Sequence, residues 1–365
     1  MLPQVLILDE QINVYKKCAN LLKLKEFKTF KRDKLFINNV TLTFQNEDDF
    51  FSVNKNSSIF KNIVWRYQSF KVINSDGETI WDGIIQDMKR NHDNKTVQIT
   101  TVDKLYKLRS EKIAYTSSDW ETPSNAVKNI MDAVSFTDYN LKSITDSSNK
   151  YNDYDGNDSQ FLIKCFFELD DNITLQQALE KLSDVGCADC FSSKNKVYFK
   201  HWKAFTGGAK VTLTINSIDN SPIVWTSETD AVNDYRINYN GSAEVPVTDG
   251  TGNDIASVSR TRYGIKDLNE MNCSENSQIV IQNLAGATYI GECYINRSHI
   301  DLSTNPRFPD YITFTLPGSH KEWIDLETYF KLTFADEDWV EKLFEVYSFE
   351  IDYDKDEIKI LALEI

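Results

Sequence analysis

Residues 79–102 read TIWDGIIQDMKRNHDNKTVQITTV and decide the fold class of the N-terminal part of the chain. The stretches 79–86 and 96–102 are rich in Ile, Val, Thr and Trp, the residue types that favour β-strands. Between them, residues 91–94 (NHDN) form a cluster of turn-forming side chains. Two strand-like runs joined by a short polar turn predict an antiparallel β-hairpin.

Strand-like runs continue on the N-terminal side of this hairpin. Residues 35–44 (LFINNVTLTF) end in an alternation that is expected to bury Val40, Leu42 and Phe44 on one face. Residues 62–73 (NIVWRYQSFKVI) predict another strand region. The N-terminus lacks the basic and apolar regions of a signal peptide, so a first strand is expected there. Strands at this regular spacing predict a small antiparallel barrel or sandwich.

The pattern changes to mixed helix and strand over residues 116–204. Apolar residues recur every three or four positions over 126–134 and 174–185, which predicts an amphipathic helix in each segment. Residues 143–160 are rich in Asn, Asp and Ser and are expected to form an exposed loop. Residues 191–199 predict a hairpin. This part of the chain is therefore expected to be a compact α+β insert.

The whole pattern predicts a mainly β fold in which two β-rich domains surround a smaller α+β domain, with an inserted helix. The expected domains are residues 1–115 as the first barrel, 116–204 as the α+β insert and 205–365 as the second barrel. A loop and helical segment at about residues 241–304 interrupts the second barrel, with its helix within 274–293.

Composition narrows the function classes. The 365 residues include 55 Asp and Glu against 40 Lys and Arg, a formal net charge of -15. A charge of this sign repels a phosphate backbone, which argues against sequence-specific DNA binding. No apolar run reaches the roughly 18 residues of a membrane-spanning helix. The 6 cysteines show no disulfide framework, so free thiols in a reducing compartment are expected.

Three short motifs resemble ligand sites but lack essential positions. Residues 151–162 place Tyr151 and Leu162 where a calcium loop has ligands. Cys187 and Cys190 have metal or redox spacing, but no second pair follows at zinc-finger distance. Residues 206–211 lack the spacing and the hydroxyl residue of a phosphate-binding loop. We expect no bound metal and no cofactor.

No catalytic constellation is found in the sequence. His92, His201, His299 and His320 are isolated from any nucleophile signature. The carboxylate groups at 170–171 and 336–338 are adjacent in sequence, whereas glycoside hydrolysis needs two groups across a cleft. The expected catalytic, cofactor-binding and metal-binding residues are therefore none.

The order of several weak motifs carries a resemblance to a known family. The motifs are Gly77-x-x-x-Trp81-x-Gly83-x-Ile85, Val97-x-Ile99-x-x-x-Asp103-x-Leu105-x-x-Leu108, Thr174-Leu-x-x-Ala178-Leu-x-x-Leu182-x-x-x-Gly186 and Ser257-Val-Ser-Arg260-Thr-Arg-Tyr263-Gly264. In this order they resemble phage baseplate hub proteins. The final strands, from residue 325 to residue 365, continue the resemblance.

This resemblance implies a structural protein of a phage tail or contractile injection system, without enzymatic activity. It implies a homotrimeric ring whose six barrels adapt a six-fold tail tube to a three-fold spike. The implied partners are further copies of the chain, the tube protein, the central spike protein and other baseplate proteins. The resemblance also implies that the two β-rich domains of each chain are tandem antiparallel β-barrels. DNA is expected only as passing cargo, and no membrane insertion is expected. If the ring encloses a DNA channel, the net charge predicts an acidic lumen that repels phosphates; the alternative is that the acidic surface only aids solubility. The implied location is the virion tail baseplate, after assembly in the host bacterial cytoplasm.

Two other classes stay open from the residues alone. A carbohydrate-active β enzyme is one, and a carbohydrate-binding module without chemistry is the other. In the enzyme, Trp65, Trp81, Trp202 or Trp225 would stack on sugar rings beside a carboxylate pair. Images of the purified protein separate these classes, because only the hub interpretation predicts rings with a central hole.

Overall fold

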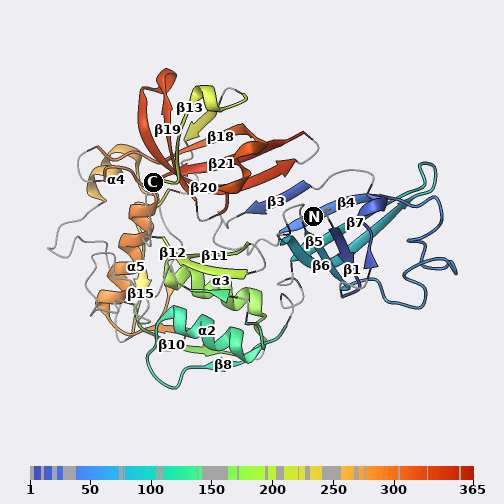
Figure 1. Cartoon of the computed structure of the whole chain (residues 1–365). Helices are drawn as coiled ribbons and strands as arrows, with labels where there is room; N and C mark the ends of the chain where they lie inside the picture. The colour runs from blue at the N-terminus through green and yellow to red at the C-terminus, as the bar shows by residue number, and fades with distance from the viewer. Residues whose placement is uncertain are drawn as a thin grey trace.

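The computed structural model describes the chain from residue 4 to residue 365 with gaps. Outside the description, besides residues 1–3, lie residues 10–11, 19–22, 28–37, 74–76, 78, 104–105, 107–108, 110, 138, 142–162, 171, 194–195, 203–208, 221, 227–230, 241–255, 267–270, 275–276, 303–304, 327 and 353–354. Figure 1 shows strands from the N-terminal part (blue), strands from the C-terminal part (red) and a group of helices with short strands. The predicted mainly β class is confirmed.

One large sheet connects the two ends of the chain. Its strand order is β14-β18-β21-β20-β3-β4-β7-β6-β5-β1-β2, with β19 beside β20 and β13 beside β19. The N-terminal β unit contains β1 (Gln4–Ile7), β2 (Ile12–Asn13), β3 (Lys23–Phe27), β4 (Asn39–Gln45), β5 (Ser69–Ile73), β6 (Thr79–Asn91) and β7 (Thr96–Asp103). The C-terminal β unit contains β13 (Val211–Thr214), β14 (Ile223–Thr226), β18 (Asp310–Pro317), β19 (Tyr329–Phe334), β20 (Trp339–Asp352) and β21 (Glu357–Glu364).

The two β units repeat the same strand order. The N-terminal unit has β5-β6-β7-β4-β3, and the C-terminal unit has β19-β20-β21-β18-β14. The register repeats as well: Gly83 of β6 lies opposite Asp103 of β7, and Phe344 of β20 lies opposite Glu364 of β21. The burial pattern of β7, read along the strand, is identical to that of β21. Each residue of β7 therefore has a structural counterpart in β21.

A β-bulge occurs at the corresponding place in the long strand of each unit. The register shifts between Ile85 and Asp87 in β6 and between Val346 and Ser348 in β20. The residues directly before β7 and β21 both have positive φ angles, 47° and 52°. Bulges bend a strand and increase its twist, so both units curve at the same position.

The units differ at their outer strands. β1 runs antiparallel to β5, whereas β13 runs parallel to β19. In the N-terminal unit an isolated bridge joins Cys18 to Phe44, which brings the segment after β2 against β4. The sheets formed by the described residues are open, so closure of the two predicted barrels stays a prediction.

Most predicted strands are found, with two corrections. Val40, Leu42 and Phe44 are buried as expected. The strand region expected over 62–73 begins only at Ser69, because Asn62 and Tyr67 adopt positive φ angles of 62° and 68°. Residues 231–239 (AVNDYRINY) also have the sequence pattern of a strand, but only β15 (Ile237–Asn238) forms there.

Both helices expected in the α+β insert are confirmed. They are α2 (Pro123–Ala133), capped by Thr122, and α3 (Leu175–Gly186), which begins with a capping box between Thr174 and Gln177. Short sheets lie beside them: β8 (Tyr115–Thr116), β10 (Cys165–Leu169) and β17 (Ile279–Ile281) form one, and β9 (Tyr139–Asn140), β11 (Ala188–Ser193) and β12 (Lys196–His201) form the other. The loop expected over 143–160 lies outside the described residues.

The inserted segment packs onto the same hydrophobic core as the α+β insert. It contains α4 (Ser257–Tyr263), β16 (Met271–Asn272), β17 and α5 (Leu284–Arg297). The helix expected within 274–293 begins only at Leu284, because Asn283 caps it and the preceding apolar residues form β17. One cluster of buried side chains runs from Ile113 to Phe199 and from Val232 to Ile295. We call the elements within residues 113–202 and 232–297 together the helical unit. The predicted domain boundaries stay predictions.

Short 3-10 helices complete the described elements. They are η1 (Tyr15–Lys17), η2 (Ile215–Ser217), η3 (Gly318–Glu322) and η4 (Ala335–Glu337).

Candidate interaction site on the C-terminal β unit

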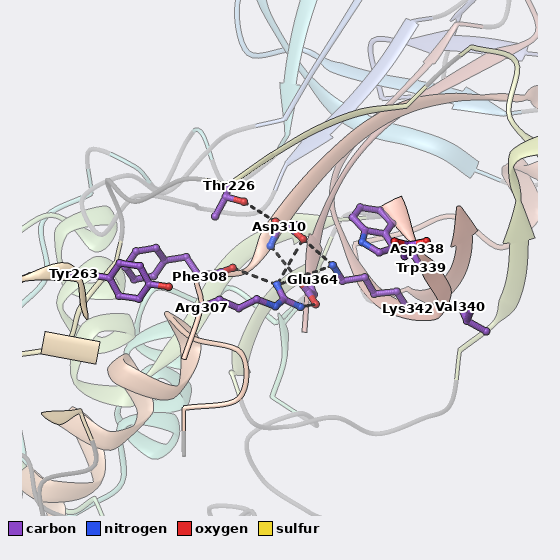
Figure 2. Close-up of a pocket in the computed structure, with 10 residues that line it drawn as sticks. All are labelled: Thr226, Tyr263, Arg307, Phe308, Asp310, Asp338, Trp339, Val340, Lys342 and Glu364. Atoms are coloured by element: carbon purple, nitrogen blue, oxygen red, sulfur yellow. Dashed lines mark hydrogen bonds and ion pairs between the residues drawn. The ribbon is translucent and has the colours of Figure 1, made fainter. Parts of the chain in front are cut away.

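A pocket of ≈ 540 Å³ opens where strands of the C-terminal β unit end beside α4 (Figure 2). β14, β18, β20 and β21 supply its strand residues, and α4 supplies Tyr263. Its lining residues are Thr226, Tyr263, Arg307, Phe308, Asp310, Asp338, Trp339, Val340, Lys342 and Glu364. Only Asp338 and Tyr263 among them belong to the sequence motifs described above, because the pocket forms from segments that are far apart along the chain.

Two cations and two carboxylates alternate across the pocket wall. Arg307 binds both carboxylate oxygens of Glu364, with 2.6 Å from Nη1 to Oε2. Lys342 Nζ lies 2.7 Å from Asp310 Oδ2 and 3.2 Å from Glu364 Oε2. The charges of these four side chains sum to zero, and Asp338 adds a negative charge to the lining.

Backbone and hydroxyl groups fix the carboxylates in place. Thr226 Oγ1 donates to Asp310 Oδ1 at 2.6 Å, and the amide of Asp310 donates to Glu364 Oε2 at 3.0 Å. The N-terminal β unit has the counterpart of the second bond, because the amide of Asn38 donates to Asp103 Oδ2 at 3.0 Å. A buried carboxylate at the end of the last strand is thus a repeated structural feature.

Asp310 is held in its ionised form by its neighbours in the pocket wall. Burial raises the pKa of Asp310, but hydrogen bonds from Lys342 and Thr226 outweigh it, so the pKa lies below its ordinary value. The hydrogen bond with Glu364 raises the pKa of Arg307. Thr226 Oγ1, which donates to Asp310 Oδ1, is a lining hydroxyl beside a carboxylate. Trp339, Phe308 and Val340 add apolar surface, so the pocket offers both paired charges and apolar side chains to a bound molecule.

A second ion network joins the helical unit to β20. Lys200 Nζ of β12 lies 3.5 Å from Glu345 Oε1, and Arg297 Nη1 of α5 lies 3.4 Å from Glu345 Oε2. Arg297 Nη2 also lies 3.3 Å from Asp189 Oδ2 of β11. Burial lowers the pKa of Arg297, but Asp189 and Glu345 outweigh it and hold the pKa above its ordinary value. The network therefore fixes how the helical unit sits on the C-terminal β unit.

The end strand β14 presents apolar side chains to solvent. Ile223 is 66% exposed and Trp225 is 40% exposed. The Trp225 ring stacks on Tyr311 of β18 with 5.8 Å between centroids. Large apolar groups on a sheet edge are uncommon in a monomer and indicate a contact surface.

The two cysteines with metal-like spacing are buried. Cys187 follows α3, and its Sγ lies 3.7 Å from the carbonyl of Ile290. Burial raises the pKa of Cys190, so its thiol stays protonated. Among the described residues, no group of three or more His, Cys, Asp or Glu could hold a metal ion. Within these residues, neither cysteine belongs to a metal site.

One histidine pairs with a serine, but inside the core. Ser259 Oγ of α4 lies 2.7 Å from His299 Nε2, and His299 Nδ1 lies 2.9 Å from the carbonyl of Ile295. Asn233 Nδ2 donates to the same serine at 3.2 Å. Ser259 is fully buried, and the position of a catalytic carboxylate is taken by a backbone carbonyl. The contact holds α4 against the end of α5.

The other histidines and acidic groups lie apart. His92 is exposed in the turn before β7, His201 stacks on Tyr289 with 5.9 Å between centroids, and His320 lies beside Trp323. Asp336 and Glu337 lie in η4. The calcium-like loop, Asp171 and residues 206–208 lie outside the described residues.

Of the four tryptophans considered for sugar stacking, one is well exposed. Trp81 is buried, Trp65 and Trp202 are partly buried, and only Trp225 lies on an open edge. Trp202 also donates to Asp189 Oδ1 at 2.9 Å. These side chains do not form a common stacking platform.

Within the described part of the chain, no helix has the length and apolar character needed to cross a membrane.

No protein-family model matches this chain, and neither does any curated protein sequence. Three solved structures share its fold over nearly the full length of both chains. A 43 kDa tail protein of prophage MuSo2 from Shewanella oneidensis has a TM-score of 0.59 at 13% identity, over 99% of this chain and 98% of its own. A tail protein from Neisseria meningitidis MC58 has a TM-score of 0.60 at 10% identity, over 99% and 96%. Prophage tail protein gp18 from Listeria monocytogenes EGD-e has a TM-score of 0.58 at 8% identity, over 100% and 94%.

Proposed function

We propose that the chain is a structural hub protein of a phage tail or a related contractile injection system. In this role it forms a homotrimeric ring between a six-fold tube and a three-fold spike. The single observation that carries the proposal is the fold, which matches three prophage and bacterial tail proteins from end to end.

The internal repeat supports a ring of three copies. Each chain carries two β units with the same strand order and the same bulge position. Three chains then present six similar units to a six-fold partner, and the single helical unit of each chain presents three copies to a three-fold partner. Closure of each unit into a barrel belongs to the same proposal, supported by the bridge between Cys18 and Phe44.

The proposed partners are the tube protein, the central spike protein and other baseplate proteins, with DNA as passing cargo. The candidate interaction site supports protein partners, because paired charges next to aromatic side chains are common in such interfaces. A role without catalysis belongs to the same proposal. The proposed location is the tail of the virion, after assembly in the bacterial cytoplasm.

The test is the mass and shape of the purified protein. We expect sedimentation at rising concentration to approach the mass of a trimer, and negative-stain images to show rings with a central hole. A protein that stays monomeric at every concentration and binds glycans would support a carbohydrate-binding module instead.

A further inference from the structure

The joint between the two β units inside one chain is a strand pair. β3 belongs to the N-terminal β unit through β4, and its other edge pairs antiparallel with residues 348–352 of β20. On the same edge of β20, residues 339–345 pair with β19. The end of β20 thus extends beyond its own unit and receives the edge strand of the other unit.

The internal repeat identifies the counterparts of these two strands. β14 pairs with β18 as β3 pairs with β4, so β14 is the counterpart of β3. Residues 87–91 of β6 pair with β7 as residues 348–352 of β20 pair with β21, so they are the counterpart of the receiving segment. Each chain therefore has a second edge strand like β3, which is β14, and a second segment like residues 348–352 that can pair with such a strand, which is residues 87–91.

Both counterparts lack a strand partner among the described residues. β14 is the last strand of the sheet and pairs only with β18. β5 pairs with β6 only as far as Ile84, and Lys89, Arg90 and Asn91 at the far end are exposed. The two segments lie in different units of the chain, and a second copy of the chain carries a matching segment for each.

The sequences of the two edge strands β3 and β14 differ in their charged residues. β3 (KLKEF) carries three charges, the kind of sequence that protects an edge strand from wrong partners. β14 (IVWT) carries none, and its side chains Ile223 and Trp225 are exposed. An edge strand without protecting charges is a template for another strand.

We propose that β14 of one copy pairs antiparallel with residues 87–91 of β6 in a second copy. The register of the internal joint, transferred to these strands, places Thr226 opposite Met88, Trp225 opposite Lys89, Val224 opposite Arg90 and Ile223 opposite Asn91. The strand pairing itself is independent of the proposed function, and only the expected number of chains in the ring, three, rests on it. Lys89 opposite Trp225 adds a cation next to an indole ring.

Charge explains why unlike units meet. In the internal joint Lys25 lies opposite Glu350 and Lys23 lies opposite Asp352, so β3 and its receiver are complementary. The same β3 placed on the end of β6 would set Lys25 opposite Lys89, and like charges directly opposite destabilise a sheet. The contact is therefore head-to-tail between unlike units, and such contacts form closed rings when the rotation allows it.

Disulfide trapping at two adjacent pairs tests this register. We expect oxidation of Trp225→Cys/Lys89→Cys or of Val224→Cys/Arg90→Cys to link separate chains, because adjacent pairs alternate in the distance between their side chains. The mismatched variant Val224→Cys/Lys89→Cys is one residue out of register and places the thiols on opposite faces, so it should not link. Of the native thiols, Cys18 is partly buried and the other five are buried.

The internal joint provides the matched control. Lys25→Cys/Glu350→Cys joins residues that lie opposite each other within one chain, so oxidation should give a cross-linked monomer. Single-cysteine variants at positions 225 and 89 measure random collision. These controls show that the chosen geometry reacts and that the linkage between chains is specific.

The outcomes separate the pairing from the proposed function. Covalent species that end at three chains support both, and a ladder that continues past three supports the pairing but contradicts the trimeric ring. A sample with the mass of a trimer that gives no link at either pair overturns the pairing and leaves the hub function standing. A monomer without any link at the highest attainable concentration overturns both.

Discussion

Gly291 of α5 lies directly against the ring of Tyr235 in the helical unit. A Cβ atom at this position would lie 1.3 Å from Cζ of Tyr235, closer than any atoms can approach. The Tyr235 ring is buried, and its hydroxyl donates to the carbonyl of Thr288 at 3.1 Å. The glycine is therefore required by packing.

We expect Gly291→Ala to lower the free energy of unfolding by at least about 1–3 kcal/mol, the usual cost of overpacking a core. Urea unfolding followed by circular dichroism measures the change. Leu284→Ala on the same helix is the control, because Leu284 is 51% exposed and its truncation should cost no more than about 0.5 kcal/mol. Equal stabilities of Gly291→Ala and the native protein would show that α5 does not pack on Tyr235.

His299 makes the stability depend on pH. Burial lowers its pKa below the ordinary 6.5, although the hydrogen bond to the carbonyl of Ile295 opposes this. The unfolded chain therefore takes up a proton at a higher pH than the folded chain does, and stability falls as the pH drops below about 6.5. Urea unfolding between pH 5 and pH 8 (roughly the range in which histidine titrates) should show a smaller pH slope for His299→Gln. Equal slopes would contradict the buried neutral imidazole.

Among the secondary-structure elements, β20 contacts the helical unit through four charged side chains that are buried or nearly buried. They are Asp189, Lys200, Arg297 and Glu345. Glu345 is the acceptor for Lys200 from β12 and for Arg297 from α5. Its counterpart in β6 is Ile84, which lies opposite Val102 as Glu345 lies opposite Leu363. The charge therefore occurs where β20 meets the helical unit and is absent from the corresponding place in β6.

Glu345→Gln should destabilise the protein by about 3–5 kcal/mol, because it leaves buried cations without their carboxylate. The matched control is Glu341→Gln, which breaks the 2.7 Å pair with Lys331 on the surface of the same strand. Water screens that pair, so its loss should cost less than about 1 kcal/mol. Thermal unfolding compares the two, and similar losses would contradict a network that holds the units together.

The whole chain carries a formal net charge of -15, which sets its behaviour toward nucleic acid. We expect no binding of a labelled DNA duplex in fluorescence anisotropy at about 0.15 M salt. Lowering the salt strengthens repulsion, so no binding should appear at about 0.01 M either. Saturable binding that tightens at low salt would reveal a basic channel and contradict the acidic one.

Short-range sequence patterns determined the elements of this protein. Alternation of apolar residues buried Val40, Leu42 and Phe44, and the cap residues before α2 and α3 fixed where those helices begin. These signals depend on the twofold period of a strand and on backbone groups within one turn of a helix, so the sequence contains them locally. The strand expected from residue 62 begins only at Ser69, and the sequence did not predict this, because positive φ angles at ordinary residues leave no local signal.

Only the tertiary structure decided how the elements combine. The pocket brings Thr226, Arg307, Lys342 and Glu364 together from separate strands, and β3 joins two units that are far apart in sequence. Likewise, α5 completes the core begun by α2 and α3. Such contacts depend on which edges and faces stay unpaired after local folding, and that is a property of the assembled sheet rather than of any segment.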